Sequence, residues 1–228
     1  MRELVLWGHQ VDEYQEMFDL TEDEMHGSIL EYGCGPSAIN ASLHETCSHI
    51  ISCDPLFALD KATLSTKVSL VYEDMAAKVK TEKDKFDFTR YGSFEQLLEK
   101  RKQGIAAFFA DFECGRAEKR YLPVNDYQLP FADFSFDFAL SSHYLFADLD
   151  EQDVEFHLQV IRELARVAKE VRIFPLIDRH NRPSSFLGPV LLGLQQENYG
   201  TEVREVRYHL QAQDNAMLRV WAQQCSLG

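Results

Sequence analysis

The residues best suited to bind a ligand are two glycines preceded by an acid. The segment 28–38 reads SILEYGCGPSA, in which Glu31 lies near the end of a short apolar run and Gly33 and Gly35 follow. Glycine tolerates positive φ and, having no Cβ, lets a ligand approach the backbone closely. A helix that starts after such a turn points unpaired N–H groups at the ligand. Because a buried carboxylate needs a partner, Glu31 indicates a ligand with an ammonium group or hydroxyls.

A second acid follows the next apolar run, which reads HIISCD over residues 49–54. Asp54 stands about twenty residues after Gly35, the separation at which an acid meets the ribose of a nucleoside. Strands at 29–32 and 49–54, joined by a helix from about 37 to about 46, would bring the glycine turn and this acid to one edge of a parallel sheet. The pattern therefore predicts an α/β unit that binds a nucleoside.

The alternation of strands and helices is then interrupted once. Residues 56–120 are richer in charge and read as helices rather than one crossover, so we predict a helical insert packed over the sheet edge. We predict a single domain over 1–228, with this insert as a lid or acceptor-binding subdomain. The elements predicted after the insert are strands at 121–124, 136–143 and 171–177, helices at 151–169 and 189–199, the latter stopped by Gly200, and antiparallel closing strands at 203–210 and 217–222.

Composition narrows the class of partner. The chain has 228 residues, is 45% hydrophobic and carries a formal net charge of −14, so it would repel nucleic acid and anionic lipid. The five cysteines have irregular spacing, which is typical of free thiols in a reducing compartment. The apolar run near Met1 is too short for a signal peptide, and we expect a cytoplasmic protein with no membrane segment. His44, Cys47, His49 and Cys53 do not match a zinc-ligand spacing, and we expect no metal.

Three motifs in order resemble class I S-adenosylmethionine-dependent methyltransferases. They are the run Ile29–Ser37, the acid Asp54, and the run LPFADFSFDFALSSH over Leu129–His143. The chain as a whole is also similar to a group of uncharacterised bacterial methyltransferase-like proteins. The resemblance covers residues 29–54 and about 121 to the C-terminus, but not the insert.

This resemblance implies an α/β fold: a Rossmann-like, seven-stranded, mostly parallel sheet with an antiparallel closing hairpin and a helical insert after the second strand. It implies S-adenosylmethionine as cofactor, with the methionine part against the glycine turn, Glu31 near its amino group and Asp54 on the ribose. The cofactor-binding residues it implies are Glu31, Gly33, Gly35, Pro36, Asp54, Asn125, Asp126, Ser141 and Ser142. Near the transferring methyl group it implies His143 as a catalytic base, with Tyr144 as the poorer candidate.

The expected function is methyl transfer to an unidentified acceptor, a small molecule rather than nucleic acid, while a protein acceptor stays open. Two alternatives remain. Residues 33–38 satisfy G-x-G-x-x-A, so the chain could instead be an NAD(P)-dependent oxidoreductase. It could also be a binding protein that keeps the methyltransferase fold without the chemistry.

Overall fold

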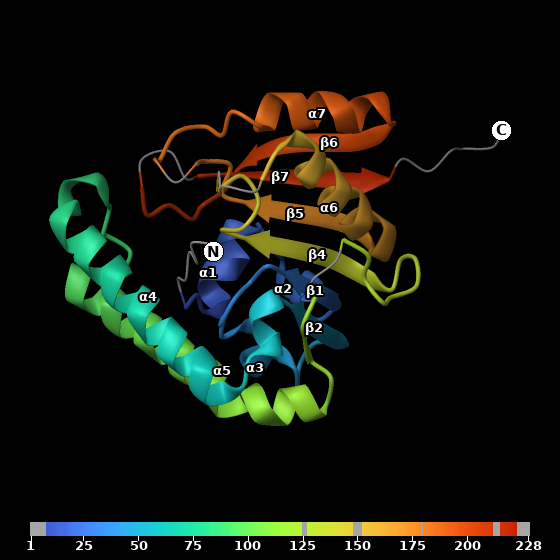
Figure 1. The fold of residues 1–228 in the computed structure, drawn as a ribbon. Helices are drawn as coiled ribbons and strands as arrows, with labels where there is room; N and C mark the ends of the chain where they lie inside the picture. Colours follow the sequence, from blue (N-terminus) through green and yellow to red (C-terminus); the bar gives the residue numbers. More distant parts are fainter. Residues whose placement is uncertain (1–7, 125–126, 148–151, 179, 212–214, 223–228) are drawn as a thin grey trace.

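A mixed sheet organises the protein (Figure 1). The computed structural model describes residues 8–124, 127–147, 152–178, 180–211 and 215–222. Within them the sheet has seven strands in the order β3-β2-β1-β4-β5-β7-β6. The strands from β1 to β5 pair in parallel, and β7 is antiparallel to both β5 and β6. Their bounds are β1 Ser28–Tyr32, β2 His49–Cys53, β3 Tyr121–Leu122, β4 Phe136–Ser142, β5 Ala168–Phe174, β6 Tyr199–Glu205 and β7 Ala216–Ala222.

Both faces of the sheet are covered, which explains why its central strands read as continuous apolar runs. On β1, Leu30 packs into one hydrophobic cluster and its neighbour Ile29 into another, as expected where successive side chains point to opposite faces. The first cluster is completed by α6 (Val154–Val167) and α7 (Leu187–Gln196), and the second by α1 (Val11–Met17) and α3 (Ile39–Leu43). The short helix α2 (Glu22–Met25) begins with a capping box of Thr21 and Glu24.

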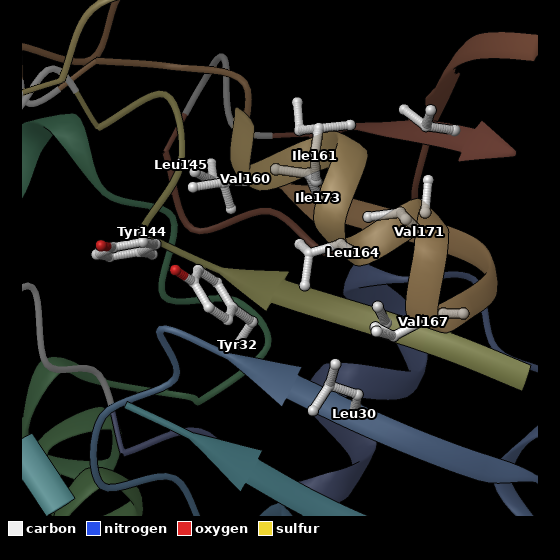
Figure 2. Close-up of a cluster of buried hydrophobic side chains, with 14 of the residues drawn as sticks. Leu30, Tyr32, Tyr144, Leu145, Val160, Ile161, Leu164, Val167, Val171 and Ile173 are labelled. Carbon is white, nitrogen blue, oxygen red and sulfur yellow. The ribbon is translucent and has the colours of Figure 1, made fainter. Parts of the chain in front are cut away.

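The helix α6 shows how the larger cluster is built. Asp153 caps it by accepting a hydrogen bond from the Phe156 N–H at 2.8 Å. Its Ile161 and Leu164 side chains are fully buried and point toward β4 and β5 in Figure 2. The predicted helix 151–169 is too long, because β5 begins at Ala168, immediately after the last helical residue.

The segment after β2 forms two long helices, α4 (Lys61–Thr81) and α5 (Phe94–Ala117), with short 3-10 turns at Pro55–Ala58 and Lys83–Lys85. In Figure 1 the pair runs side by side and projects past the sheet. A third cluster of six buried residues fixes it to the edge: Phe57, Leu64, Val68, Phe108, Phe112 and Tyr121. No helix in the described residues is both long and apolar enough to span a bilayer.

The second closing strand is confirmed, since β7 covers the predicted 217–222, but the first lies differently from the sequence prediction. The helix α7 ends at Gln196, and Asn198 takes the left-handed conformation with φ +62°. Gly200 does not stop the helix but lies in β6. A Cβ added to Gly200 would lie 2.2 Å from the indole of Trp221, so the ring leaves no room for a side chain there. The strand therefore starts at Tyr199 and ends at Glu205, and its prediction at 203–210 is wrong.

Candidate functional site

The candidate site lies where the carboxyl ends of β1, β2 and β4 meet. The chain order of the sheet reverses between β1 and β4, and ligands of open α/β sheets bind at such a switch point. The turn 33–38 leaves β1 here and leads into α3, which is shorter than the predicted helix at 37–46. The turn is tied to β2 by a hydrogen bond of 2.9 Å from the Gly33 N–H to the Cys53 carbonyl.

The glycine turn needs glycine for conformation and for space. Gly33 and Gly35 have φ of +67° and +55°, in the left-handed region that favours glycine. A Cβ on Gly33 would also lie 2.4 Å from Cγ of Tyr144. Figure 2 shows Tyr144 beside Tyr32, at the ends of β4 and β1. The space of the missing side chain at Gly33 is thus filled by the protein itself, and a cofactor contact to this backbone stays a prediction.

Asp54 binds the turn from the neighbouring strand. Its Oδ2 accepts a hydrogen bond from the Gly35 N–H at 2.9 Å, and its Oδ1 accepts one from the Leu56 N–H at 2.8 Å. The side chain is 5% exposed. A carboxylate offers about four acceptor positions, which suits two adjacent hydroxyls. The acceptor chemistry of Asp54 fits the ribose of a nucleoside cofactor, and its contact with a cofactor stays a prediction.

Glu31 lies deeper than the sequence suggested. It is fully buried, and its carboxylate accepts hydrogen bonds from the hydroxyls of Ser37 at 2.8 Å and Ser52 at 2.5 Å. The hydroxyl of Tyr14, from α1, lies near the same carboxylate. Burial raises the pKa of Glu31, while the three hydroxyls act in the opposite direction. Side chains of the protein itself surround the Glu31 carboxylate. Glu31 would therefore influence a bound cofactor only indirectly, through these neighbouring hydroxyl groups.

A second polar layer stands behind Glu31. Asn40 donates from Nδ2 to Ser52 Oγ at 2.9 Å, and its Oδ1 accepts from Arg120 Nη1 at 2.6 Å. The Arg120 guanidinium is held by Asp111 of α5 in a bidentate ion pair. The sequence analysis missed this layer, since nothing in the local pattern relates residues about eighty positions apart.

His143 follows β4 and has φ +54°, an uncommon conformation for a residue with a side chain. Its Nδ1 lies 2.8 Å from Ser142 Oγ, and its ring stacks on that of His9 with centroids 4.7 Å apart. Burial, with a smaller effect of the Arg101 charge, lowers the pKa of His143 to about 3. The imidazole is therefore neutral at physiological pH, and it is a weaker base than an ordinary histidine.

The segment before α1 crosses the site and is held by the insert. The His9 carbonyl accepts from the Ala38 N–H at 3.1 Å, and Gln10 Nε2 donates to the Lys100 carbonyl at 3.0 Å. A Cβ on Gly104 of α5 would lie 2.2 Å from the carbonyl oxygen of Gly8, so the two backbones touch. Sequence reasoning found none of these contacts, because His9 and Tyr14 precede every motif.

Most of the predicted site residues come together at this end of the sheet. Contacts connect Gly35 with Asp54, Gly33 with Tyr144, and Ser142 with His143. Pro36 is buried inside the turn, and Ser141 is buried on β4 with an Oγ that lacks a hydrogen-bond partner among the described residues. Asn125 and Asp126 lie outside the described residues.

Two further features bear on possible chemistry, the metal-ligating side chains and a surface hollow. In the described part of the chain, no three His, Cys, Asp or Glu side chains are grouped so as to hold a metal ion. An open hollow of about 880 Å³ lies at the opposite end of the sheet, between Glu24, Asp137, Lys169 and Trp221. It shares no residue with the glycine turn and belongs to a different surface.

Comparisons with known proteins agree with this architecture. No family model matches the chain. An uncharacterised protein of Methanocaldococcus jannaschii is 25% identical over 219 residues, which cover 96% of each chain. The crystal structure of a putative S-adenosyl-L-methionine-dependent methyltransferase from Methanococcus maripaludis matches with a TM-score of 0.50 and 11% identity, covering 98% of this chain and 88% of that one. The predicted fold class is thereby confirmed: the chain has the fold of the class I S-adenosylmethionine-dependent methyltransferases.

Proposed function

We propose that the protein is an S-adenosylmethionine-dependent methyltransferase that acts on a small molecule. The observation that carries the proposal is the position of Asp54, which joins the end of β2 to the glycine turn after β1. A fold shared with a putative methyltransferase supports it. The M. jannaschii relative, whose activity is uncharacterised, adds no choice of substrate.

S-adenosylmethionine supplies a methyl group already activated on a sulfonium, so the protein has to bind, align and exclude water. Asp54 would accept the ribose hydroxyls, and the backbone at Gly35 would lie along the methionine part. Asn125 or Asp126 would hold the adenine, with Pro36, Ser141 and Ser142 shaping the pocket. Tyr144, packed over Gly33, would close the site on the β4 side.

His143 is the group we assign to proton removal from the acceptor. Its ring is only partly buried at the end of β4, so it can meet an acceptor. Its pKa of about 3 makes it a weak base, so the role would require an acceptor whose proton is already acidic. Tyr144 is the weaker candidate, because it is buried between Tyr32 and Phe156. A base is required only for an acceptor that carries a proton at neutral pH.

The acceptor is proposed from charge and from the insert. A net charge of −14 opposes nucleic acid, so a small molecule is favoured and a protein is second. We propose the insert over 56–120 as the acceptor-side subdomain of a single domain, since α5 holds the segment carrying His9. The acidic charge and the free thiols of the described cysteines agree with a cytoplasmic location.

The oxidoreductase alternative is weakened by the topology. Dinucleotide-binding sheets have the order 3-2-1-4-5-6, whereas here the antiparallel β7 stands between β5 and β6. A catalytically silent binding protein is the stronger competitor, because Tyr144 already fills the space beside Gly33.

Isothermal titration with S-adenosylhomocysteine and with NADH tests the proposal. We expect a Kd of about micromolar order for S-adenosylhomocysteine and no heat with NADH. Turnover is then followed as release of S-adenosylhomocysteine from S-adenosylmethionine across a panel of phenols, carboxylates and amines. Binding of NADH alone would favour the oxidoreductase, and cofactor binding without turnover on any acceptor would favour the silent protein.

A further inference from the structure

We infer that the outer edge of β6 pairs with β6 of a second copy of the chain, so that two sheets join across a twofold axis at Val203. The sheet ends at β6, because only β7 pairs with this strand among the described residues. Figure 1 shows β6 beside α7, on the side of the sheet away from β2. The candidate site lies at the ends of β1, β2 and β4, so this inference does not depend on the proposed function.

The backbone of β6 has an unpaired ladder on its outer side. The strand pairs with β7 over seven residues without a bulge, and one pair further the Val206 N–H donates to the Asn215 carbonyl at 2.8 Å. Backbone groups alternate in direction along an antiparallel strand, so those of Thr201, Val203 and Glu205 point away from β7. The strand also has no proline or lysine, which commonly protect an edge. These outward groups are therefore able to bind another strand.

The charges of β6 select one register for this pairing. With the axis at Val203, Thr201 lies opposite Glu205 of the second copy, and Glu202 lies opposite Arg204 of the second copy. The outward backbone groups then meet in hydrogen-bonded pairs, whereas the charged residues fall in the pairs between them, where side chains are closest. Symmetry repeats each attraction. Moving the axis to Glu202 or to Arg204 would instead set like charges opposite one another, which is unfavourable.

Glu202 and Arg204 already form an ion pair within one strand, at 3.2 Å, with side chains 40% and 35% exposed. Arg219 of β7 donates to the same carboxylate at 2.6 Å. In the paired strands each carboxylate would keep these arginines nearby and gain one from the second copy, so the charges alternate in sign across the axis. Exposed ion pairs contribute little affinity, and we assign to them the choice of register.

Apolar side chains lie beside the ladder. Val203 is 48% exposed, and Leu192 of α7 is 57% exposed. The helix is hydrogen-bonded to the edge strand, since Gln195 Nε2 donates to Thr201 Oγ1 at 3.2 Å. Leu192 precedes Gln195 by three residues and therefore lies on the same side of the helix. The two copies of Val203 would meet at the axis. Because a single pair of strands is a small interface, we expect a weak dimer.

Sedimentation velocity of the full chain over a range of concentrations tests the pairing. At about 0.15 M salt, which screens the net charge of −14 on each copy, we expect a reversible dimer with a Kd of about micromolar order. Val203→Pro removes the N–H at the axis, which β7 does not use, and an edge strand tolerates proline at such a position. Circular dichroism should show this variant folded, and it should sediment as a monomer.

Either of two results overturns the inference at this stage. One is an unmodified protein that stays monomeric well above the expected Kd, which would leave the edge to a strand of another protein. The other is a dimer that persists in folded Val203→Pro, which would place the interface on another surface.

Charge reversal tests the register. Arg204→Glu sets a second carboxylate opposite Glu202, and Glu202→Arg sets a second guanidinium opposite Arg204, so each variant alone should lose about tenfold or more in association. An equimolar mixture restores opposite charges at both positions, and the two variants should then associate with each other about as tightly as the unmodified chains.

Lys78→Glu is the matched control, because it changes the net charge as much as Arg204→Glu does. Lys78 is exposed on α4, which packs at the β3 end of the sheet, and its variant should dimerise like the unmodified protein. Reversal variants that stay monomeric when mixed overturn the inference, as does a dimer that neither reversal weakens.

Discussion

Arg101 of α5 and Glu13 of α1 form an ion pair from which water is excluded. Nη1 of the arginine lies 2.7 Å from each carboxylate oxygen, and both side chains are 0% exposed. The hydroxyl of Tyr91 donates to the same carboxylate at 2.5 Å, and Arg101 Nη2 donates to Tyr91 and Tyr208 at 3.2 Å. This cluster joins the insert to the helix that supplies Tyr14, so it connects the fold to the candidate site.

Removing one partner of this pair should be costly. Arg101→Met or Glu13→Gln leaves the other charge buried, and we expect each to lower the free energy of unfolding by about 3–5 kcal/mol. The double variant Arg101→Met/Glu13→Gln should cost much less than the sum, because neither charge is left alone. Urea denaturation of the four proteins measures both effects.

The exposed pair Arg162–Glu197 is the control, with side chains 33% and 38% exposed. Its single variants should change stability by about 1 kcal/mol or less, as surface ion pairs do. Equal effects at both pairs would contradict the role given to burial.

Asp54→Asn should weaken cofactor binding. The amide keeps one acceptor oxygen and replaces the other with a donor, so it cannot hold both the Gly35 N–H and two ribose hydroxyls. We expect a loss of about 1.5–3 kcal/mol, measured by titration with S-adenosylhomocysteine. Asp60→Asn is the matched control, because Asp60 also accepts from a backbone N–H, that of Thr63, but caps α4. Equal affinities for the three proteins would remove Asp54 from the ribose site.

Gly33→Ala should destabilise the fold through two separable effects. A side chain at φ +67° costs about 1–2 kcal/mol, and the new Cβ would overlap the Tyr144 ring. Overlap in a packed region adds about 1–3 kcal/mol. In a Tyr144→Ala background only the first cost should remain in full, which a double-mutant cycle in urea resolves.

Gly188→Ala provides the reference, since a Cβ there meets nothing within 4 Å. It lies in α7 and should stabilise the protein slightly, by up to about 1 kcal/mol. An additive Gly33–Tyr144 cycle would show that the ring yields without cost.

Stability should fall as the pH drops from 6.5 to 5. Burial and neighbouring charges lower the pKa of His9 and His143, so both stay neutral in the folded protein while the unfolded chain takes up protons below about 6.5. The unfolded state then binds more protons, and each histidine removes about 1.4 kcal/mol per pH unit, for His143 down to about pH 3. Urea midpoints at several pH values measure this slope.

His9→Gln should reduce the slope, whereas His180→Gln, at an exposed position, should leave it unchanged. The interval from 6.5 to 5 lies above the ordinary titration of carboxyl groups, so the histidines give the main slope, and Glu31, whose pKa burial raises, acts in the opposite direction. A flat profile in the unmodified protein would mean that the imidazoles reach water before they protonate.

The sheet could be predicted from sequence because its signals are local. Apolar runs ending in Glu31 and Asp54, with glycines between them, specify a strand, a turn and a strand without reference to distant residues. The strand at 136–143 and the helix after it have equally strong periodicity, and the structure places β4 and α6 there. The errors lie at element boundaries. Gly200 was predicted to end a helix, but it is a strand residue whose missing side chain makes room for the Trp221 indole.

The candidate site could be predicted only in its cofactor half. Asp54 and the glycine turn belong to one β-α-β unit, so about twenty residues of spacing were informative. His9 and Tyr14 enter from a segment with no motif, and Arg101 and Arg120 enter from the insert. Their roles depend on which distant surfaces pack together, and a single sequence does not encode such pairings in a local pattern.

The contact between Gly8 and Gly104 has a consequence for engineering. At Gly104, α5 contacts the segment before α1, and through Asp111 it holds Arg120 of the second polar layer. The helices α4 and α5 therefore cannot be removed without disturbing the candidate site. Replacing this pair of helices with a short linker would also release His9 and Tyr14. A transfer of the candidate site to another protein would have to include both the helix pair and the segment before α1.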